Sequence, residues 1–258
     1  MSNWDFLKEN NIDVWCICLK ERDDRYTYVT NEFTRIGLID KVNWHRPERN
    51  KIGSLGCLLS HKFCAESAYN NDKHALVFED DVVFTDDWVE KIKYVKKFLC
   101  NESNWDIFRF GAIISSLHKK SKSSDHIWLC KSFANHALIY NKNIIKQTFL
   151  LTNFTDNYHI DDYCHNNNLS EFALIDNMCY QKNGLGSDNI WWNENIIQGF
   201  MLHPLIFERL QKYNNMQMNW LSLLPICIQE YLTIWGALTK LGFLTLKLKS
   251  ILQYKSKN

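Results

Sequence analysis

Short apolar runs alternate with amphipathic segments along roughly the first 180 residues of the chain. An apolar run of four to eight residues that contains no turn signal predicts a buried strand. We therefore expect strands near residues 14–19, 74–78, 105–111, 133–140 and 172–176.

Between these runs, apolar residues recur at helical spacing. Leu55, Leu58, Leu59 and Phe63 predict a helix from about residue 54 to residue 69 that packs against a sheet. Two further helices are expected at 86–99, where aspartates open the segment, and at 141–151. Strands that alternate with helices predict an α/β fold, with a sheet flanked by helices.

Two segments depart from this pattern. Residues 115–125 are rich in Ser, Lys and His and have no apolar period, which predicts a mobile loop. From Trp220 to Leu252 apolar residues dominate, and four lysines lie near the end of the chain, at positions 247, 249, 255 and 257. We expect a domain at 1–212 and an amphipathic helical tail at 213–258.

The tail carries a wide apolar face and terminal lysines. This combination suits either an interfacial helix on an anionic membrane or a helix docked onto a protein, and both remain open. Pro225 and Glu230 argue against a spanning segment.

Composition narrows the function classes. Lys plus Arg (30) nearly equal Asp plus Glu (29), so no basic field indicates nucleic acid as a partner. The nine cysteines form no C-x-x-C pair, and we expect no Cys/His zinc cluster. The amino-terminal residues show no secretory pattern, so we expect a cytoplasmic protein with reduced thiols, and the tail offers a peripheral route to a membrane.

The most informative chemistry follows the strand at 74–78. Glu79, Asp80 and Asp81 are three adjacent carboxylates, which repel one another unless water or a cation neutralises them. Apolar residues on both sides hold this segment near the interior. Because ligands of α/β sheets bind just outside strand ends, the triplet predicts a divalent-metal site rather than a solvated turn.

Other polar groups stand near predicted strand or helix ends. Arg22 and Arg25 lie three apart after the first strand, where they suit a diphosphate or form plain surface ion pairs. Ser60 and His61 lie on the mostly buried helix at 54–69. For His61, a core histidine and a residue near a donor sugar are equally open.

A second acidic group lies further along the chain. Asp161 and Asp162 open a predicted helix, where one can be an N-cap or a general base. Asp188 lies in a glycine-rich loop and is a third candidate for the base.

Taken in order, these motifs resemble glycosyltransferase family 25, which includes lipopolysaccharide and procollagen galactosyltransferases. The resemblance covers roughly residues 12–190. It rests on 17–25 (ICLKERDDR), the glycine-cysteine-serine-histidine block formed by Gly53, Gly56, Cys57, Ser60 and His61, then 76–82 (LVFEDDV), Ala137, 160–161, Gln181 and 187–188.

The resemblance implies a GT-A-like fold and a nucleoside-diphosphate sugar donor, for which a UDP-hexose is the family-weighted expectation. The Glu79-Asp80-Asp81 triplet would serve as the DxD-like element, with Mn²⁺ or Mg²⁺ on Asp80 and Asp81. The donor would also meet Arg22, Arg25, Ser60 and His61. Asp161 is the preferred base, with Asp162 and Asp188 as alternatives. The acceptor would be a hydroxyl of a glycan, lipopolysaccharide or protein, attacked with inversion.

Two alternatives compete with this interpretation. A metal-dependent phosphoesterase or nuclease also needs clustered acids at strand ends, although the neutral charge balance disfavours nucleic acid. The second alternative is a non-catalytic relative that binds nucleotide sugars. Two departures from the family pattern favour it: Ser54 stands where the family usually has a glutamate, and the segment before Gly53 is short.

Overall fold

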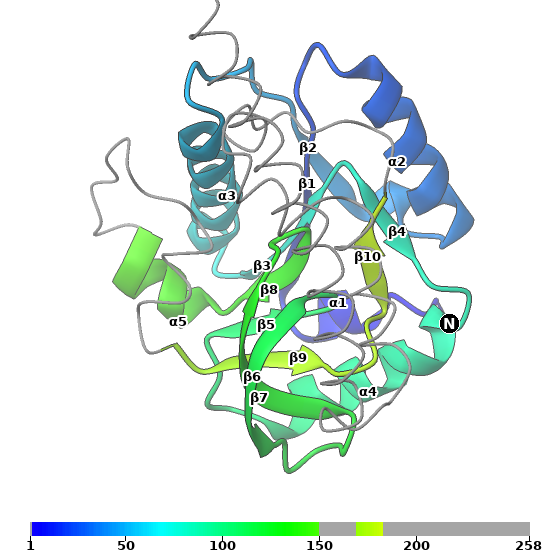
Figure 1. Ribbon diagram of the computed structural model, residues 1–258, viewed down its shortest axis with the longest axis vertical. Helices are drawn as coiled ribbons and strands as arrows, with labels where there is room; N and C mark the ends of the chain where they lie inside the picture. Colours follow the sequence, from blue (N-terminus) through cyan, green and yellow to red (C-terminus); the bar gives the residue numbers. More distant parts are fainter. Residues whose placement is uncertain (1, 150–168, 183–258) are drawn as a thin grey trace, which may run out of the picture. The chain divides into compact units, whose positions relative to one another are not determined.

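The computed structural model describes residues 2–149 and 169–182 (Figure 1). Its helices are α1 (Phe6–Glu9), α2 (Asp23–Arg35), α3 (Gly53–Asn70), α4 (Trp88–Asn101) and α5 (Lys142–Ile144), with a 3-10 turn η1 (Ile39–Lys41) and a π-helical turn η2 (Ile145–Phe149). Its strands are β1 (Ile12–Ile17), β2 (Val42–His45), β3 (His74–Glu79), β4 (Val82–Phe84), β5 (Ile107–Arg109), β6 (Ile113–Lys120), β7 (Ile127–Phe133), β8 (Ala137–Tyr140), β9 (Glu171–Leu174) and β10 (Cys179–Gln181).

A mixed eight-stranded sheet forms the centre, in the order β2-β1-β3-β8-β5-β9-β7-β6. β1 is parallel to both β2 and β3, and β5 is parallel to β9. β8 runs antiparallel between β3 and β5. The expected α/β fold, with a mixed sheet and flanking helices, is confirmed.

Alternation along β3 divides the hydrophobic core into two layers. Leu76 and Phe78 belong to the cluster that includes residues of α2 and α4, whereas Ala75 and Val77 belong to the cluster built with α3 and α5. Successive side chains of a strand point to opposite faces, so this division follows from the period of two. Figure 1 shows α3 and α5 on one side of the strands and α2 and α4 on the other.

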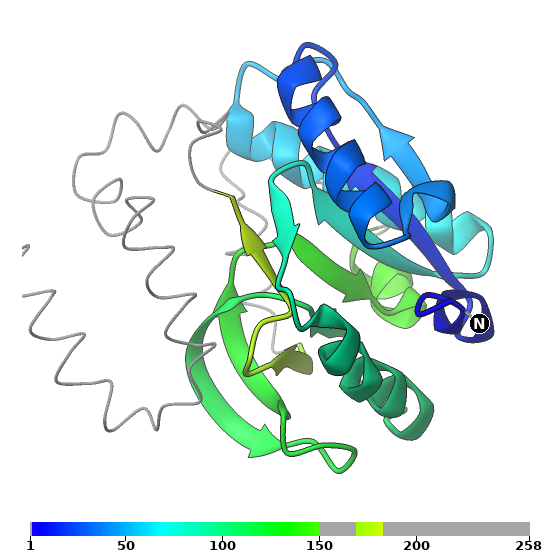
Figure 2. The same ribbon diagram turned by 90° about the vertical axis from the view of Figure 1, so that its right-hand side faces the viewer.

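The register of the parallel strands brings three strand ends to one edge of the sheet. Ile17 at the end of β1 pairs with His45 at the end of β2 and with Glu79 at the end of β3. The chain then turns at Asp80 and Asp81 into β4, which pairs with β10 in a separate two-stranded sheet (Figure 2). The acidic triplet therefore lies where open α/β sheets bind ligands.

The prediction of a loop at 115–125 was wrong over its first half. β6 extends to Lys120 and pairs with β7, with irregular register between Ile114 and Ser116 and between Leu117 and Lys119. β6 is the last strand of the sheet order, and edge strands are commonly lysine-rich and bulged. Such a strand buries too little of its own surface to show the alternation on which sequence patterns depend.

The other predicted elements agree with the structure within a few residues. α3 matches the helix expected at 54–69, α4 matches the one at 86–99, and α5 with η2 fills the start of 141–151. In the described part of the chain, no helix combines the length and apolar character that a membrane crossing requires. The tail expected at 213–258 lies outside the described residues, and so does its division from 1–212.

Candidate functional site

Glu79 ends β3 and faces α3. Its place in the alternation follows Ala75 and Val77, so its carboxylate is directed to the side of the sheet that α3 covers. Oε1 lies 3.3 Å from His61 Nε2 and 3.6 Å from Cys57 Sγ, and Oε2 accepts from the Gln181 amide at 3.2 Å. Burial is the largest single effect and raises the pKa of Glu79, but the hydrogen bonds and charges of its neighbours, His61 first among them, together hold the pKa below its usual value.

Asp80 points to the opposite side, toward α2. It forms an ion pair of 2.5 Å with Nη1 of Arg25, and both residues are buried, at 5% and 6% exposure. Burial raises the pKa of Asp80 even though Arg25 lowers it. A hydrogen-bonded guanidinium group therefore fixes this carboxylate in a poorly solvated place.

Asp81 completes the turn between the two sides. Its Oδ2 lies 3.6 Å from Arg25 Nη1, and its Oδ1 lies 3.5 Å from the Gln181 amide nitrogen. Burial and then the negative charge of Glu79 raise the pKa of Asp81 to about 8. Asp81 is therefore the group of the triplet whose negative charge the protein stabilises least.

These contacts indicate that the triplet fits a divalent cation. Three carboxylates lie within one turn, and Arg25 is the guanidinium group that contacts two of them. A divalent cation at Asp80 and Asp81 would relieve the repulsion that raises the pKa of Asp81. Carboxylate oxygens are the ligands that Mg²⁺ and Mn²⁺ prefer.

The two arginines have different partners, although they lie only three residues apart in the sequence. Arg22 precedes α2 and forms a bidentate pair with Asp24, its Nε and Nη2 atoms lying 2.9 and 2.7 Å from the carboxylate oxygens. Arg25 reaches Asp80 instead. Arg22 therefore forms a surface ion pair, which is one of the two roles expected for it. Arg25 instead contacts the acidic triplet.

Ser60 and His61 are both buried in α3. The Ser60 hydroxyl donates to the Gly56 carbonyl at 2.8 Å, a contact within the helix. His61 links two strands, because Nε2 faces Glu79 while Nδ1 lies 3.0 Å from the Tyr140 hydroxyl of β8. His61 therefore contacts the acidic triplet, and Ser60 contacts the helix backbone.

Two residues of the site received no role from the sequence. Gln181, on β10, bridges Glu79 and Asp81, and its place in the site depends on the β4–β10 pairing.

The expectation of no Cys/His cluster was wrong, because ligand atoms of Cys57, His61 and Glu79 lie within 4.8 Å of one another. The sequence feature that could have predicted this cluster is the four-residue spacing of Cys57 and His61, which places both side chains on one face of a helix.

The predicted bases Asp161, Asp162 and Asp188 lie outside the described residues. Their roles, and the choice among them, stay predictions.

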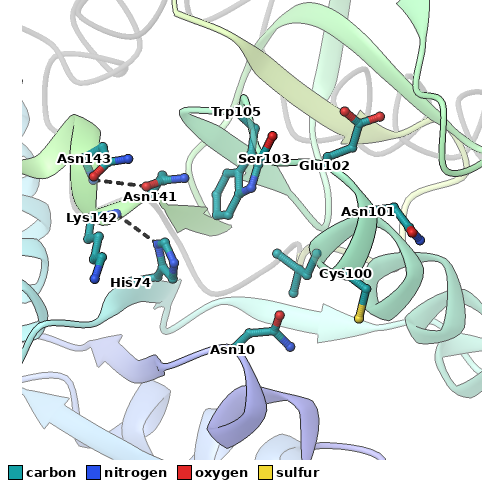
Figure 3. A pocket seen from close by; sticks show the side chains of 11 residues that line it. Asn10, His74, Cys100, Asn101, Glu102, Ser103, Trp105, Asn141, Lys142 and Asn143 are labelled. Carbon is teal, nitrogen blue, oxygen red and sulfur yellow. Dashed lines mark hydrogen bonds between the residues drawn. The ribbon is translucent and has the colours of Figure 1, made fainter.

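A separate cavity of about 380 Å³ lies at the other end of β3 (Figure 3). His74, the first residue of β3, lines it together with Trp105 and polar residues of α4 and α5. In Figure 3 the Lys142 backbone donates to His74 Nδ1, a contact of 3.0 Å. This cavity and the acidic triplet are at opposite ends of one strand, so the cavity is not part of the triplet site.

Comparisons with known proteins give a family match and structural likenesses, of which one is described here. The chain is similar to the crystal structure of A197 from STIV at 7% identity and a TM-score of 0.43, over 67% of this chain and 86% of that chain. That likeness is too weak to support an argument. No curated protein matched. Residues 43–160 match the model of glycosyltransferase family 25, described as an LPS biosynthesis protein.

The matched segment runs from β2 through the Gly56-Cys57 block and the acidic triplet to β8 and beyond, so it contains most of the site described above. The family indicated by the sequence motifs is thereby supported, because residues 43–160 match the model of glycosyltransferase family 25.

Proposed function

We propose that this glycosyltransferase moves a hexose, galactose or glucose, from a UDP-sugar to a hydroxyl group of a glycan, lipopolysaccharide or protein acceptor. The reaction uses Mn²⁺ or Mg²⁺ and inverts the anomeric carbon. The observation that carries the proposal is the turn at Asp80 and Asp81, which is held against Arg25 at the carboxyl end of β3. The family match supports the transfer of a sugar in general.

In this proposal Asp80 and Asp81 hold the cation of a GT-A-like site. When bound, the cation supplies positive charge to the diphosphate leaving group. Arg25 acts as a positioning residue, because its guanidinium group fixes the Asp80 carboxylate and its side chain is only 8% exposed. Gln181 does the same for Asp81 from β10.

The acceptor hydroxyl loses its proton to a carboxylate, for which Asp161 remains the preferred candidate and Asp162 and Asp188 the alternatives. A base on the face opposite the leaving diphosphate gives in-line attack and therefore inversion. Arg22 keeps its proposed diphosphate contact, which requires it to exchange the exposed Asp24 for phosphate.

A screen of nucleotide sugars with Mn²⁺ tests the proposal without an acceptor, because many transferases slowly transfer the sugar to water. We expect release of the nucleoside diphosphate from one UDP-hexose, and loss of at least about tenfold in rate for Asp81→Asn, equal to about 1.4 kcal/mol. Asp72→Asn is the matched control, since Asp72 precedes the other end of β3 and its side chain is 86% exposed.

Release of nucleoside monophosphate or cleavage of DNA in the same screen would identify a phosphoesterase instead. Binding of a nucleotide sugar with no release of product, also after addition of glycan acceptors, would identify a non-catalytic relative.

A further inference from the structure

The side of the acidic triplet that faces α3 carries a second set of metal ligands. Cys57 and His61 lie four residues apart on α3, so both project to one face of the helix, toward the end of β3. Glu79 meets them there. Asp80 and Asp81 contact Arg25 instead, although Gln181 still links Asp81 to Glu79.

We infer that Cys57, His61 and Glu79 bind one zinc-like divalent cation, in a site distinct from the proposed donor-metal site at Asp80 and Asp81. A thiolate, an imidazole and a carboxylate are the three ligand types that Zn²⁺ takes in proteins. The set is softer than the oxygen ligands that Mg²⁺ and Mn²⁺ prefer. A thiolate and a carboxylate also balance the charge of one divalent cation.

Two of the three distances between the ligand atoms match the edges of a zinc tetrahedron. With a Zn–S bond of about 2.3 Å, Zn–O and Zn–N bonds of about 2.1 Å and tetrahedral angles, the S···O edge is about 3.6 Å and the N···O edge about 3.4 Å. The corresponding distances are 3.6 Å from Cys57 Sγ to Glu79 Oε1 and 3.3 Å from His61 Nε2 to Glu79 Oε1. The third edge, between Cys57 Sγ and the His61 nitrogen, is at most 4.8 Å, against about 3.6 Å in a tetrahedron, so cation binding requires Cys57 and His61 to move closer together.

Tyr140 supplies the outer contact that zinc-binding histidines usually have. Its hydroxyl lies 3.0 Å from His61 Nδ1, and both residues are buried. With Nδ1–H donating to Tyr140, the Nε2 lone pair is directed at the cation. In a neutral imidazole without a cation, Nε2–H donates to Glu79 and the Tyr140 hydroxyl donates to Nδ1. The tautomer of His61 therefore reports the occupancy of the site.

Three protein ligands leave a fourth position for water or another ligand. The Glu79 side chain is 21% exposed and Cys57 is partly exposed, so this position has access to solvent. Sites of this kind, with three ligands and an open position, are typical of reactive rather than closed structural zinc sites.

Cobalt binding to the full chain, reduced and stripped of metal, tests the inference directly. Co²⁺ takes the place of Zn²⁺ and gives a cobalt–thiolate charge-transfer absorption only when a cysteine coordinates it. We expect this absorption in the wild-type protein, saturation at about one Co²⁺ per chain, and its loss on addition of Zn²⁺ but not of Mg²⁺.

Cys57→Ser should abolish the charge-transfer absorption, whereas Cys64→Ser, in the same helix but packed in the core, should keep it. Tyr140→Phe should keep the absorption and weaken Zn²⁺ binding about 10- to 100-fold, since it removes the outer contact of His61. Circular dichroism establishes that each variant is folded.

Absence of the absorption in the wild-type protein would overturn the inference, as would an unchanged absorption in Cys57→Ser, which would place the cobalt on other cysteines. The inference does not depend on the proposed transferase reaction. Asp81→Asn should lose metal-dependent nucleotide binding but keep the cobalt–thiolate absorption, so the two proposals fail separately.

Discussion

Three neighbouring carboxylates at the end of β3 have three different surroundings. Glu79 meets neutral donors and His61, Asp80 meets Arg25, and Asp81 lies between them with a pKa of about 8. The period of two along the strand sends the first two to opposite sides of the sheet. Three adjacent carboxylates that look equivalent in the sequence therefore have different partners and different pKa shifts, because the backbone directs them to different sides.

His74, at the start of the same strand, makes stability depend on pH. Burial, and then the charge of Lys142, lower the pKa of His74 from 6.5 to about 4, and its Nδ1 accepts from the Lys142 backbone. The unfolded chain therefore binds the proton more tightly between these pH values. The contribution of His74 to the free energy of unfolding is therefore complete above pH 6.5 and is lost as the pH decreases toward 4.

We expect His74→Asn to reduce this loss, because an Asn side chain can accept the same hydrogen bond and does not titrate. Since His74 is partly exposed, the difference is on the order of 2 kcal/mol between neutral and acidic pH. Urea unfolding at pH 7 and pH 4.5 measures it. An equal loss in the variant and the wild-type protein would rule out His74 as the cause.

A buried ion pair joins β5 to β9. Arg109 and Glu171 are both essentially inaccessible to solvent, with 3.2 Å between Arg109 Nε and Glu171 Oε1. Arg109 also donates to the Ala134 carbonyl and the Asn135 side chain, both at 2.8 Å, and Ser132 contacts Glu171. At the scale of elements, this network ties the sheet to the turn between β7 and β8.

Glu171→Leu should cost about 3–5 kcal/mol of stability, because it leaves the Arg109 charge buried without its carboxylate. Arg109→Met combined with Glu171→Leu should be less destabilised than Glu171→Leu alone, since no charge is then left buried. Denaturant unfolding of the two single variants and the double variant gives the coupling energy. Additive losses would contradict the pairing.

Gly111 permits the close contact between the segment that follows β5 and the start of β10. A Cβ at this position would overlap the Cys179 carbonyl oxygen and lie 2.7 Å from His136 Nε2. Because the nearest obstacle is backbone, Gly111→Ala should destabilise the fold by about 1–3 kcal/mol or more.

Gly37→Asn is the control for Gly111→Ala. Nothing lies within 4 Å of a Cβ at Gly37, and Asn tolerates its positive φ better than most residues. Thermal unfolding compares the two variants. Equal unfolding midpoints in the two variants would show that the backbone at Gly111 and Cys179 can move apart without cost.

Sequence patterns predicted β3 and α3, and missed β4 and β7 as well as the edge strand β6. β3 and α3 were predictable because each carries its own hydrophobic period, whereas β6 is defined by its pairing with β7. For the site, Asp80, Asp81 and Glu79 were predictable from one strand end. The roles of Gln181 and Cys57 were not, because they depend on contacts across 102 and 22 residues of chain.

At the scale of the whole molecule, the two proposed metal sites lie at one place, the turn that follows β3. Asp80 and Asp81 form the proposed donor-metal site, and Glu79 is a ligand of the proposed zinc-like site. The segment that matches glycosyltransferase family 25 contributes Cys57, His61 and the triplet, while Arg25 comes from α2 before it and Gln181 from β10 after it. Elements on both sides of the matched segment therefore complete the site.

The central claim is that Asp80 and Asp81 bind a nucleoside diphosphate through a divalent cation. Calorimetric titration of the wild-type protein and of Asp81→Asn with UDP, in Mn²⁺ and in EDTA, tests it most directly. We predict binding by the wild-type protein in Mn²⁺, and at least about tenfold weaker binding, or about 1.4 kcal/mol, in EDTA and in Asp81→Asn. UDP binding of equal affinity in all these conditions would contradict the claim.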